Sequence, residues 1–478
     1  MKGAAAPLRA ARRGGRRASP FSTAWLYARL HHLIGNLRGA HLCVAYSGGA
    51  DSTALLAGLA TLRTRYGFKL RALHINHQLQ VGADAMAGAA LRSARQLRVR
   101  CELLQEPVRP ARGESLEAAA RSVRTAALHR ERQVGEWLLL AQHLDDQLET
   151  VLLQLLRGAG VAGLAAMPEA AGYTLRPLLG VRRSSLHEYL RRRGLPWHED
   201  PSNQDERFDR NYLRRRVAPL LEARWPAAAV TIARSARLAA EAQRLLETLA
   251  DQSLSNAVDG SALQVAVLRR LNPAACHNAL RRWLALRALP LPDQRRLQEI
   301  AGPMLRARRD SQPQVAWPGA VVRRHGDLLY ALAAVAGPGP RPVALPGAAA
   351  AAPLRWNWRL RPRLSLPDGA QLELRAELAG ALSLSALPDQ FEIRFRLGGE
   401  RLAARHGRQT LKRLLQERHL PPWLRSSVPL LYAGERLVAV ADWWHEPALQ
   451  GDAGSSPVTA GAVRARLIWQ PPLGSTQI

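Results

Sequence analysis

A short glycine-rich turn carries the clearest chemical signal in the sequence. Residues 45–53 read AYSGGADST and follow the apolar run HLCV at 41–44. Backbone N–H groups at a helix start form an anion site, and glycines let the backbone approach the anion closely. The turn lacks both the GK[ST] of a Walker A loop and a GxGxxG pattern. It predicts a different phosphate site, although an ordinary turn is the simpler alternative. The candidate residues are Ser47, Gly48, Gly49, Ala50, Asp51 and Ser52.

A second polar cluster lies in AQHLDDQLET, residues 141–150. On a helix, Asp145 and Asp146 lie three or four residues from Glu149 and share a face with it. Such carboxylates can position an ammonium group and accept a proton from it. His143 precedes them and could orient a phosphate or an acid. The alternative is an acidic first turn that only stabilises its helix.

Further polar and basic side chains stand near strand or helix ends. HINHQL, at 74–79, contributes two histidines and an asparagine, which could equally be polar strand-end residues. Arginines in LEAAARSVR, and the segment EDPSNQDERFDRNYLR at 199–214, could contact a phosphate or form solvated faces. A basic unit around GRQTLKRLLQE could contact RNA phosphates. The candidates are His74, Asn76, His77, Arg121, Arg124, Arg207, Arg210, Asn211, Arg405, Lys412 and Arg413.

The elements that must position these residues alternate between strand-like and helical patterns. Apolar runs at 41–46, 70–75, 99–104 and 137–141 predict strands, and the segments 52–65, 84–96, 115–133 and 145–156 predict helices. This alternation favours a parallel sheet with helices on both faces. Ligands of such sheets bind at the carboxyl ends of the strands, where all the motifs above fall.

Taken together, the motifs resemble a known family. A strand, then SGGxDS, then a helix resembles the PP-loop of the ATP pyrophosphatases, which have the adenine nucleotide α hydrolase-like fold. HINHQL, residues 141–160 and residues 199–214 narrow the likeness to tRNA(Ile)-lysidine synthetase. Residues 395–425 are similar, more loosely, to the tRNA-binding C-terminal domain of that family. Residues 227–390 match only in length and helical character.

The resemblance implies a specific two-step ligation. The C2 oxygen of the wobble cytidine in a CAU anticodon attacks the α-phosphorus of ATP and releases pyrophosphate. The amine of free L-lysine then attacks C2 and expels AMP, giving lysidine, so that the tRNA reads AUA instead of AUG. ATP is thus the co-substrate and Mg²⁺ the expected metal.

The chemical demands of these two steps give roles to the candidates. The loop serines and glycines would bind pyrophosphate, and Asp51 with one of Asp145 and Asp146, preferably Asp146, would hold Mg²⁺. A free lysine amine has a pKa of about 10.4 and must lose a proton before it attacks. Asp146 is the expected base and Glu149 the expected ammonium anchor, although Asp145 stays open as the base.

The overall composition agrees with a nucleic-acid partner. The 478 residues carry 68 Lys and Arg against 38 Asp and Glu, a net charge of +30, which attracts polyanions. Cys43, Cys101 and Cys276 form no CxxC pair, so a zinc or iron–sulfur site built from such pairs is not expected. No run of about 20 apolar residues predicts a membrane span. We therefore expect a cytoplasmic enzyme that binds tRNA(Ile) and lysine; a homodimer stays open.

The expected domain order follows from these patterns. A basic, flexible arm is predicted at 1–37, a PP-loop catalytic domain at 38–220 and a mostly helical tRNA-contacting domain at 227–335. A linker rich in Pro, Gly and Ala at 336–353 leads to a small α+β C-terminal tRNA-binding domain at 354–455.

Three other functions compete with this one. A PP-loop tRNA thiolase would need sulfur-carrying cysteines, commonly in CxxC pairs. An amidotransferase-type synthetase would bring a glutaminase domain and little basic excess. A non-catalytic RNA-binding protein would not need Asp51, His143, Asp145 and Asp146.

Overall fold

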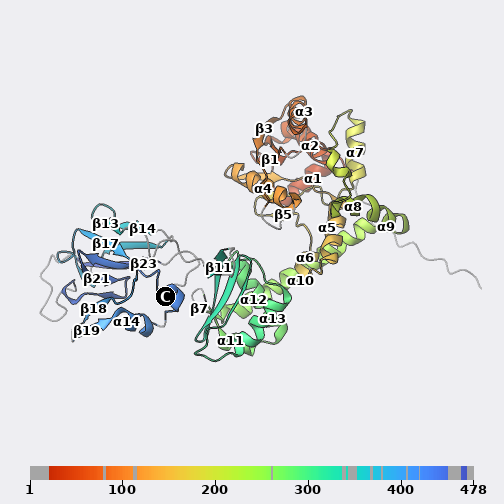
Figure 1. Cartoon of the computed structure of the whole chain (residues 1–478). Coiled ribbons are helices and arrows are strands. Elements are labelled where there is room, and N and C mark those ends of the chain that lie inside the picture. The colour runs from red at the N-terminus through yellow and green to blue at the C-terminus, as the bar shows by residue number, and fades with distance from the viewer. Residues whose placement is uncertain are drawn as a thin grey trace, which may run out of the picture. The chain divides into compact units, whose positions relative to one another are not determined.

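The computed structural model divides into two compact units, Met1–Leu245 and Leu246–Ile478 (Figure 1). Within them it describes residues 21–78, 82–110, 116–259, 262–335, 341–342, 353–366, 370–377, 381–404, 407–418, 420–449 and 464–470. None of the helices in these ranges is both long enough and apolar enough to cross a membrane.

The first unit is built on a six-stranded sheet in the order β3-β2-β1-β4-β6-β5. Every neighbouring pair is parallel except the hairpin of β5 with β6. The order reverses between β1 and β4, so the connections diverge there and leave a crevice for ligands at the carboxyl ends. The strands are β1 (His41–Ala45), β2 (Lys69–Asn76), β3 (Arg100–Gln105), β4 (Glu136–Leu139), β5 (Ala170–Ala171) and β6 (Thr174–Leu175). The predicted parallel sheet is confirmed; the β5–β6 hairpin was not predicted.

Helices cover both faces of this sheet, as the sequence predicts. Leu42 and Val44 of β1 belong to the core cluster that includes residues of α1, α2 and α7, whereas Cys43 packs with Leu128 of α4. Burial raises the pKa of Cys43 to about 12, so this thiol stays neutral. The helices are α1 (Thr23–Ile34), α2 (Ala50–Tyr66), α3 (Ala83–Gln96), α4 (Leu116–Glu131), α5 (Leu144–Leu156), α6 (Val161–Leu164), α7 (Arg183–Arg192), α8 (Asp209–Tyr212) and α9 (Ala218–Arg224).

The N-terminal arm is shorter than predicted. Residues 21–34 fall within the flexible arm expected at 1–37, but Phe21, Leu26 and Leu30 are almost fully buried in the core of the first unit. Ser22 caps α1 by accepting a hydrogen bond from Trp25 N at 3.1 Å. The basic composition of residues 1–20 masked an amphipathic helix that comes directly after it. Residues 1–20 themselves lie outside the described ranges.

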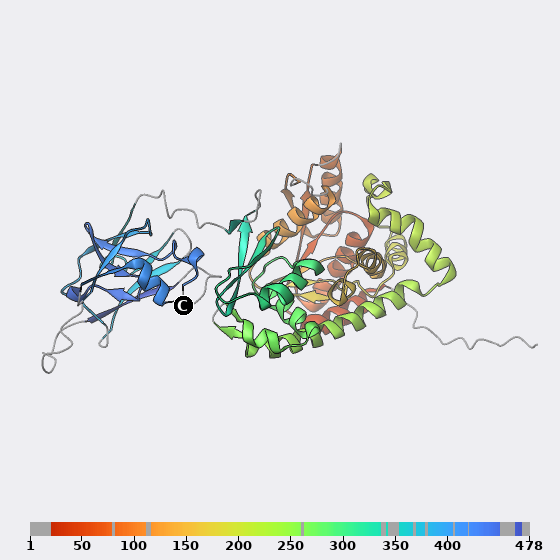
Figure 2. The same cartoon turned by 60° about the horizontal axis from the view of Figure 1, so that its bottom comes forward.

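The long helix α10 (Ala228–Ser255) has 28 residues, and the boundary between the two units falls within it. It is the long green helix of Figure 2. Beyond it, α11 (Val265–Arg270), α12 (Pro273–Leu286) and α13 (Gln294–Glu299) pack on an antiparallel sheet in the order β7-β8-β11-β10-β9. Its strands are β7 (Val258–Asp259), β8 (Ala262–Gln264), β9 (Gln314–Trp317), β10 (Ala320–His325) and β11 (Leu328–Val335). The prediction of a mostly helical domain at 227–335 is therefore right for α10 to α13 and wrong for the sheet β7 to β11.

The C-terminal part of the second unit is an α+β assembly with its own core. Two antiparallel sheets have the orders β13-β17-β20-β21-β22 and β14-β15-β23-β16. Helix α14 (Leu411–Glu417) packs on them through Leu411, Leu414 and Leu415. The strands include β13 (Leu354–Asn357), β14 (Arg363–Ser365), β15 (Gln371–Ala376), β16 (Leu382–Ser383), β17 (Gln390–Arg394), β20 (Leu430–Ala433), β21 (Arg436–Val440), β22 (Trp444–His445) and β23 (Arg464–Gln470). Strands β18 (Arg401–Ala404) and β19 (Gly407–Thr410) form a separate hairpin. Most of the predicted linker lies outside the described residues, apart from β12 (Arg341–Pro342) and residue 353.

Because α1 is buried in the core, truncation of its side chains should lower the stability of the first unit. Leu30→Ala removes a fully buried side chain, and such truncations cost about 2–5 kcal/mol because a cavity remains. Pulse proteolysis in urea, with fragments assigned by mass, measures the stability of the first unit. His32→Ala, at an exposed position of the same helix, is the matched control and should change little. Equal behaviour of the two variants would contradict the packing of α1.

Candidate active site

The glycine-rich turn joins β1 to α2 at the carboxyl end of the sheet. Gly48 has φ +80°, and a Cβ there would lie 3.0 Å from Ala90 Cβ, so only glycine fits easily. Ser52 Oγ donates to Gly49 O at 3.1 Å and accepts from Ser47 N at 3.2 Å, which fixes the turn. Gly49 caps α2 without a side-chain hydrogen bond. The loop can therefore present helix-start N–H groups to an anion.

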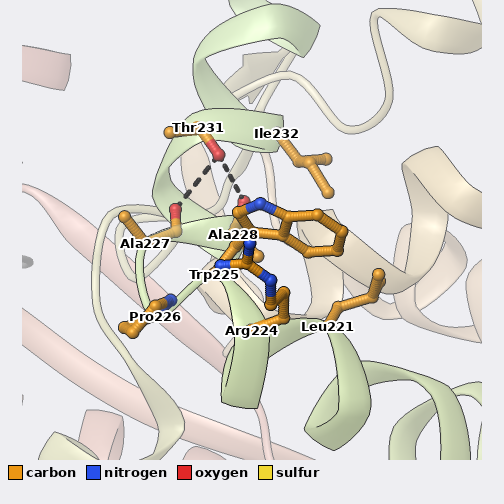
Figure 3. Close-up of a pocket in the computed structure, with 8 residues that line it drawn as sticks. All are labelled: Leu221, Arg224, Trp225, Pro226, Ala227, Ala228, Thr231 and Ile232. Atoms are coloured by element: carbon orange, nitrogen blue, oxygen red, sulfur yellow. Dashed lines mark hydrogen bonds between the residues drawn. The ribbon is translucent and has the colours of Figure 1, made fainter. Parts of the chain in front are cut away.

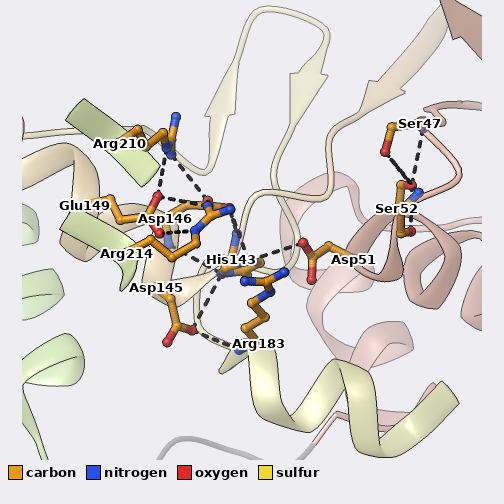
Figure 4. A network of polar contacts seen from close by, with 11 residues as sticks. Ser47, Asp51, Ser52, His143, Asp145, Asp146, Glu149, Arg183, Arg210 and Arg214 are labelled. Carbon is orange, nitrogen blue, oxygen red and sulfur yellow. Dashed lines mark hydrogen bonds and ion pairs between the residues drawn. The ribbon is translucent and has the colours of Figure 1, made fainter. Parts of the chain in front are cut away.

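His143 lies at the centre of a carboxylate cluster and is 1% exposed (Figure 4). Its Nδ1 accepts a hydrogen bond from Asp146 N at 3.3 Å, and Asp146 Oδ2 accepts one from His143 N at 3.0 Å. This capping box starts α5 and puts the ring proton of the neutral form on Nε2. Nε2 lies 3.4 Å from Asp51 Oδ2 and 3.5 Å from Asp146 Oδ2. The ring thus joins the loop after β1 to the loop after β4.

The surrounding carboxylates decide the charge of this ring. Burial opposes protonation of His143, but the charges of Asp146, Asp51 and Asp145 outweigh it and raise the pKa of the ring. For Asp51, burial likewise favours the neutral form, whereas the close contact with the His143 ring and the charges of His143, Arg183 and His187 lower the pKa overall. The ion pair of Asp51 with His143 is therefore mutually stabilised.

Two arginines, Arg210 and Arg214, neutralise Asp146 and Glu149. Glu149 is 2% exposed and accepts from Arg214 Nε at 2.6 Å and from Arg210 Nε at 2.8 Å. Both guanidinium groups also reach Asp146 Oδ1, at 3.1 Å and 3.3 Å. Burial disfavours the charged form of Arg214, but Glu149 and Asp146 raise its pKa overall. Arg210 was predicted as a site residue; Arg214 was not, although its spacing of four from Arg210 puts both on one helical face.

Asp145 and Asp146 have different surroundings. Asp145 Oδ2 accepts from the backbone N of Arg183 at 2.8 Å, and its Oδ1 lies 3.1 Å from Arg182 Nη2. It therefore holds the start of α7, whereas Asp146 lies against His143 and the two arginines. The sequence pattern DD could not separate these two environments.

Arg183 and His187 were missed by sequence reasoning, although both influence Asp51. They lie four residues apart on α7, and the Arg183 side chain points toward Asp51 and His143 (Figure 4). Within the described part of the chain, Arg183 Nε and His187 Nε2 are buried without a hydrogen-bond partner. Burial and the charge of Arg183 lower the pKa of His187. The spacing on a helix was visible in the sequence, but nothing there showed that α7 approaches the loop.

A second group of predicted residues gathers at the carboxyl end of β2. His74 Nδ1 lies 2.9 Å from Tyr46 O, and His77 Nδ1 lies 3.2 Å from Glu106 O. Arg124 Nε donates to His77 Nε2 at 3.4 Å, and burial lowers the pKa of both histidines. Asn76 Nδ2 donates to Asp84 Oδ1 at 2.7 Å. These side chains therefore present neutral rings and an arginine.

The other predicted residues lie apart from these clusters. Arg121 is exposed on α4. Arg207 is 89% exposed and pairs with Asp205, whose backbone oxygen accepts from Asn211 Nδ2 at 2.9 Å. Lys412 and Arg413 are exposed on α14 in the second unit. Arg405 lies outside the described residues.

The described residues contain no group of three or more His, Cys, Asp or Glu that could hold a metal ion by themselves. Asp51 Oδ1, at the loop, is nevertheless buried and finds no hydrogen-bond partner among those residues. Mg²⁺ is commonly held by one or two carboxylates together with substrate phosphates. Asp51 fits such a partial site better than Asp146, because both oxygens of Asp146 are engaged.

The loop, the helix behind it and the parallel sheet define a PP-loop domain that binds ATP. A family model described as "PP-loop domain" matches residues 23–221. Two further models, "TilS substrate binding domain" and "TilS substrate C-terminal domain", match residues 263–330 and 391–463.

Relatives define the family more narrowly. The chain is 43% identical over 407 residues to tRNA(Ile)-lysidine synthase of Alkalilimnicola ehrlichii, covering 84% of this chain and 89% of that protein. The enzyme of the same name from Escherichia coli O157:H7 is 38% identical over 434 residues, covering 88% and 96%. The chain belongs to the tRNA(Ile)-lysidine synthase family, whose members are ATP-using ligases. The resemblance seen in the sequence is confirmed.

The carboxylates around His143 lead to a prediction about the pKa of its ring. In metal-free buffer, we expect the pKa of His143 to lie above the ordinary 6.5 and to fall in Asp51→Asn, which removes one of the three charges. Because the folded-state pKa is raised, this interaction stabilises the fold below about pH 6.5 and is lost as the pH rises through the folded-state pKa. Two-dimensional NMR of the ring nitrogens measures the pKa, and the signal is assigned by its absence in His143→Gln.

Asp209→Asn, at an exposed position of α8, is the control for this titration and should leave the pKa unchanged. A pKa of His143 that stays constant or rises in Asp51→Asn would contradict the proposed charge balance.

Proposed function

We propose that this protein joins free L-lysine to C2 of the wobble cytidine of tRNA(Ile) with a CAU anticodon and forms lysidine. The observation that carries the proposal is the contact between the PP-loop aspartate and the carboxylate cluster of α5, made through His143. ATP chemistry at the loop and amine chemistry at the cluster thereby fall within one site. Family membership supports the choice of substrates. The cytoplasm is the proposed location, because ATP, tRNA and free lysine meet there.

In the first step, the C2 oxygen of the cytidine attacks the α-phosphorus of ATP, and pyrophosphate leaves. Ser47, Gly48, Gly49 and Ser52 are the proposed N–H and hydroxyl donors to the pyrophosphate part, for which the Ser52 hydroxyl would exchange its hydrogen bond to Gly49 O. Arg183 and His187 lie near Asp51 and can offer further hydrogen-bond donors to the pyrophosphate part of ATP. A bound Mg²⁺ at Asp51, with Asp146 as a second candidate ligand, would neutralise charge on the phosphates. The adenylated cytidine then carries AMP as its leaving group.

In the second step, the lysine amine attacks C2, the C2–O bond breaks and AMP leaves. An amine with an ordinary pKa of about 10.4 is mostly protonated at neutral pH, so the site must accept a proton. Asp146 is the proposed base, since Asp145 is committed to the start of α7. Glu149 is the proposed ammonium anchor.

The role of Glu149 requires a change of partners. Both of its oxygens accept hydrogen bonds from Arg210 and Arg214 in this structure. An ammonium group reaches Glu149 only when one guanidinium moves away. The displaced arginine would then have a substrate anion to bind, either the α-carboxylate of lysine or a phosphate.

The remaining basic residues are proposed to hold the tRNA. Arg121 and Arg124 lie on the same helix, with Arg124 beside His77, and would contact the target nucleotide together with His74 and Asn76. Lys412 and Arg413 of α14, with Arg405, would contact phosphates of the tRNA, which position a nucleic acid without reading its sequence. The net charge of +30 favours this encounter.

The direct test is transfer of labelled lysine to unmodified tRNA(Ile) with a CAU anticodon, in the presence of ATP and Mg²⁺. We expect incorporation that falls about 10²–10⁴-fold in Asp146→Asn, the range for loss of a general base. The methionine tRNA, which shares the CAU anticodon, is the control and should take up no lysine. Folded protein that binds the tRNA without transferring lysine would support another PP-loop tRNA modification, or a non-catalytic RNA-binding protein.

A second test concerns the first step alone. Arg183→Ala is expected to slow tRNA-dependent ATP–pyrophosphate exchange by about tenfold to a hundredfold, because a hydrogen bond to a charged phosphate is lost. The hydrogen bond from the backbone N of residue 183 to Asp145 persists in this variant. Arg192→Ala, 61% exposed on the same helix, is the matched control. An exchange rate equal to that of the wild type would remove Arg183 from the phosphate site.

A further inference from the structure

A second concave site in the first unit lies at the turn between α9 and α10. It is an open hollow of about 400 Å³ that is lined mainly by apolar atoms, including those of Leu221, Trp225, Pro226 and Ile232 (Figure 3). Trp225 ends α9, and its N donates to Leu221 O at 2.7 Å, so the backbone holds the residue in place. The Trp225 side chain is nevertheless 58% exposed. A large aromatic ring fixed at a helix end and open to solvent suits stacking of a flat ligand.

A cation lies over this ring. Arg224 Cζ is 5.8 Å from the centroid of the Trp225 ring. Nucleobases stack on aromatic rings and on guanidinium planes, and together these side chains form the usual platform for unpaired bases of RNA. A peptide helix would also use the apolar surface, but it lacks the flat bases that stack on the ring and the guanidinium group.

The local charge favours a nucleic acid. The continuous helical segment 209–224 carries Arg210, Arg214, Arg215, Arg216 and Arg224 against Asp209 and Glu222. Glu222 is already paired with Arg182, with Oε1 2.6 Å from Nη1. Arg210 and Arg214 are likewise engaged, with Asp146 and Glu149, and Arg215 and Arg216 share the single carboxylate of Glu206. The surface beside the platform keeps a positive excess, because Arg215, Arg216 and Arg224 outnumber Glu206.

The same segment links the platform to the active site. Arg182 pairs with both Glu222 of α9 and Asp145 of α5. Arg214, which contacts Asp146, precedes Trp225 by eleven residues, a separation of about 16 Å along a helix. A few nucleotides of single-stranded RNA span this distance. The platform thus lies within reach of a nucleotide close to the one that reacts.

The chemistry of the site supplies the reason for such a platform. A base whose C2 must reach both the α-phosphorus and an amine has to leave the stack of its neighbours. A neighbour then loses its stacking partner, and a protein ring can replace it. We infer that Trp225 and Arg224 stack an unpaired base of the anticodon loop close to the wobble cytidine. This inference rests on the proposed function and adds to it a base-binding site outside the PP-loop and the carboxylate cluster.

The test is a double-mutant cycle with the full chain and tRNA(Ile) that carries one abasic nucleotide at a time across the anticodon loop. We expect Trp225→Ala to weaken binding of intact tRNA about fivefold to a hundredfold, the range for one stacked base. One abasic position should cause the same loss in wild-type protein and no further loss in Trp225→Ala. Trp225→Phe should restore most of the binding, and KM for ATP and for lysine should not change.

Two further variants keep the test decisive. Arg224→Gln leaves the ring in place and should lose a smaller part of the binding, at the same abasic position. Leu220→Ala removes a side chain that is 73% exposed on the same helix and should bind every tRNA normally. If Trp225→Ala does not fold, Trp225→Phe and Arg224→Gln with the abasic series still decide the outcome.

Two results would overturn the inference: losses that add at every abasic position, or unchanged tRNA affinity in Trp225→Ala. Unchanged tRNA affinity together with a changed oligomeric state would assign the pocket to a contact between protein chains. Lysine transfer by the wild-type protein is measured in parallel. Absence of lysine transfer would contradict the proposed function. Normal lysine transfer, without coupling between Trp225→Ala and any abasic position, would contradict only the base-stacking site.

Discussion

The site depends on one constraint: nearby cations must balance the negative charges of its buried and half-buried carboxylates. Asp51 lies in the first turn of α2, Asp145 and Asp146 lie in the first turn of α5, and Glu149 lies in the next turn of α5. Like charges this close disfavour ionisation unless cations lie among them. His143 and the guanidinium groups of Arg182, Arg210 and Arg214 supply those cations. Removal of one member of a buried ion pair is costly, because its partner stays charged in a poor solvent. The network therefore ties α2, α5, α7 and the segment 209–224 together.

The fold brings these charges together through sheet topology. β1 and β4 are neighbours in the sheet although β2, β3 and three helices lie between them in the sequence, and their parallel register aligns His41 with Glu136. Both strands therefore end at the same edge, with the PP-loop after one and His143 after the other. α7 and residues 209–224 have no strand of their own in the site. α7 packs on the core through Leu186, Tyr189 and Leu190. Ion pairs of Arg182, Arg210 and Arg214 with the carboxylates add to the positioning of α7 and of residues 209–224, so the charge balance also contributes to packing.

Sequence patterns identified the parts that obey local rules. Periodicity and apolar runs located β1 to β4 and α2 to α5 to within a few residues, and glycine spacing identified the loop. Patterns did not identify Arg183, His187 and Arg214 as neighbours of the carboxylates, because this requires knowing where α7 and the segment 209–224 dock. They also missed α1, hidden behind a basic stretch. The strands β9 to β11 carried readable hairpin signals, including PG at 318–319, but the helical residues around them dominated the prediction.

A wide helical turn lies between the arginines that contact the carboxylate cluster and the pocket beside Trp225. Residues Leu213–Val217 form a π-helical turn between α8 and α9. Bonding from i to i+5 adds about one residue to the turn and rotates the helix beyond it, and such turns are frequent at functional sites. In an uninterrupted α-helix, the position two turns beyond Arg214 is close to residue 221. With the extra residue it becomes Glu222, which pairs with Arg182, and Leu221 is left to line the pocket beside Trp225. Because of the extra residue in the π-helical turn, the arginines of this segment face the carboxylates, and the aromatic ring at its end is exposed to solvent.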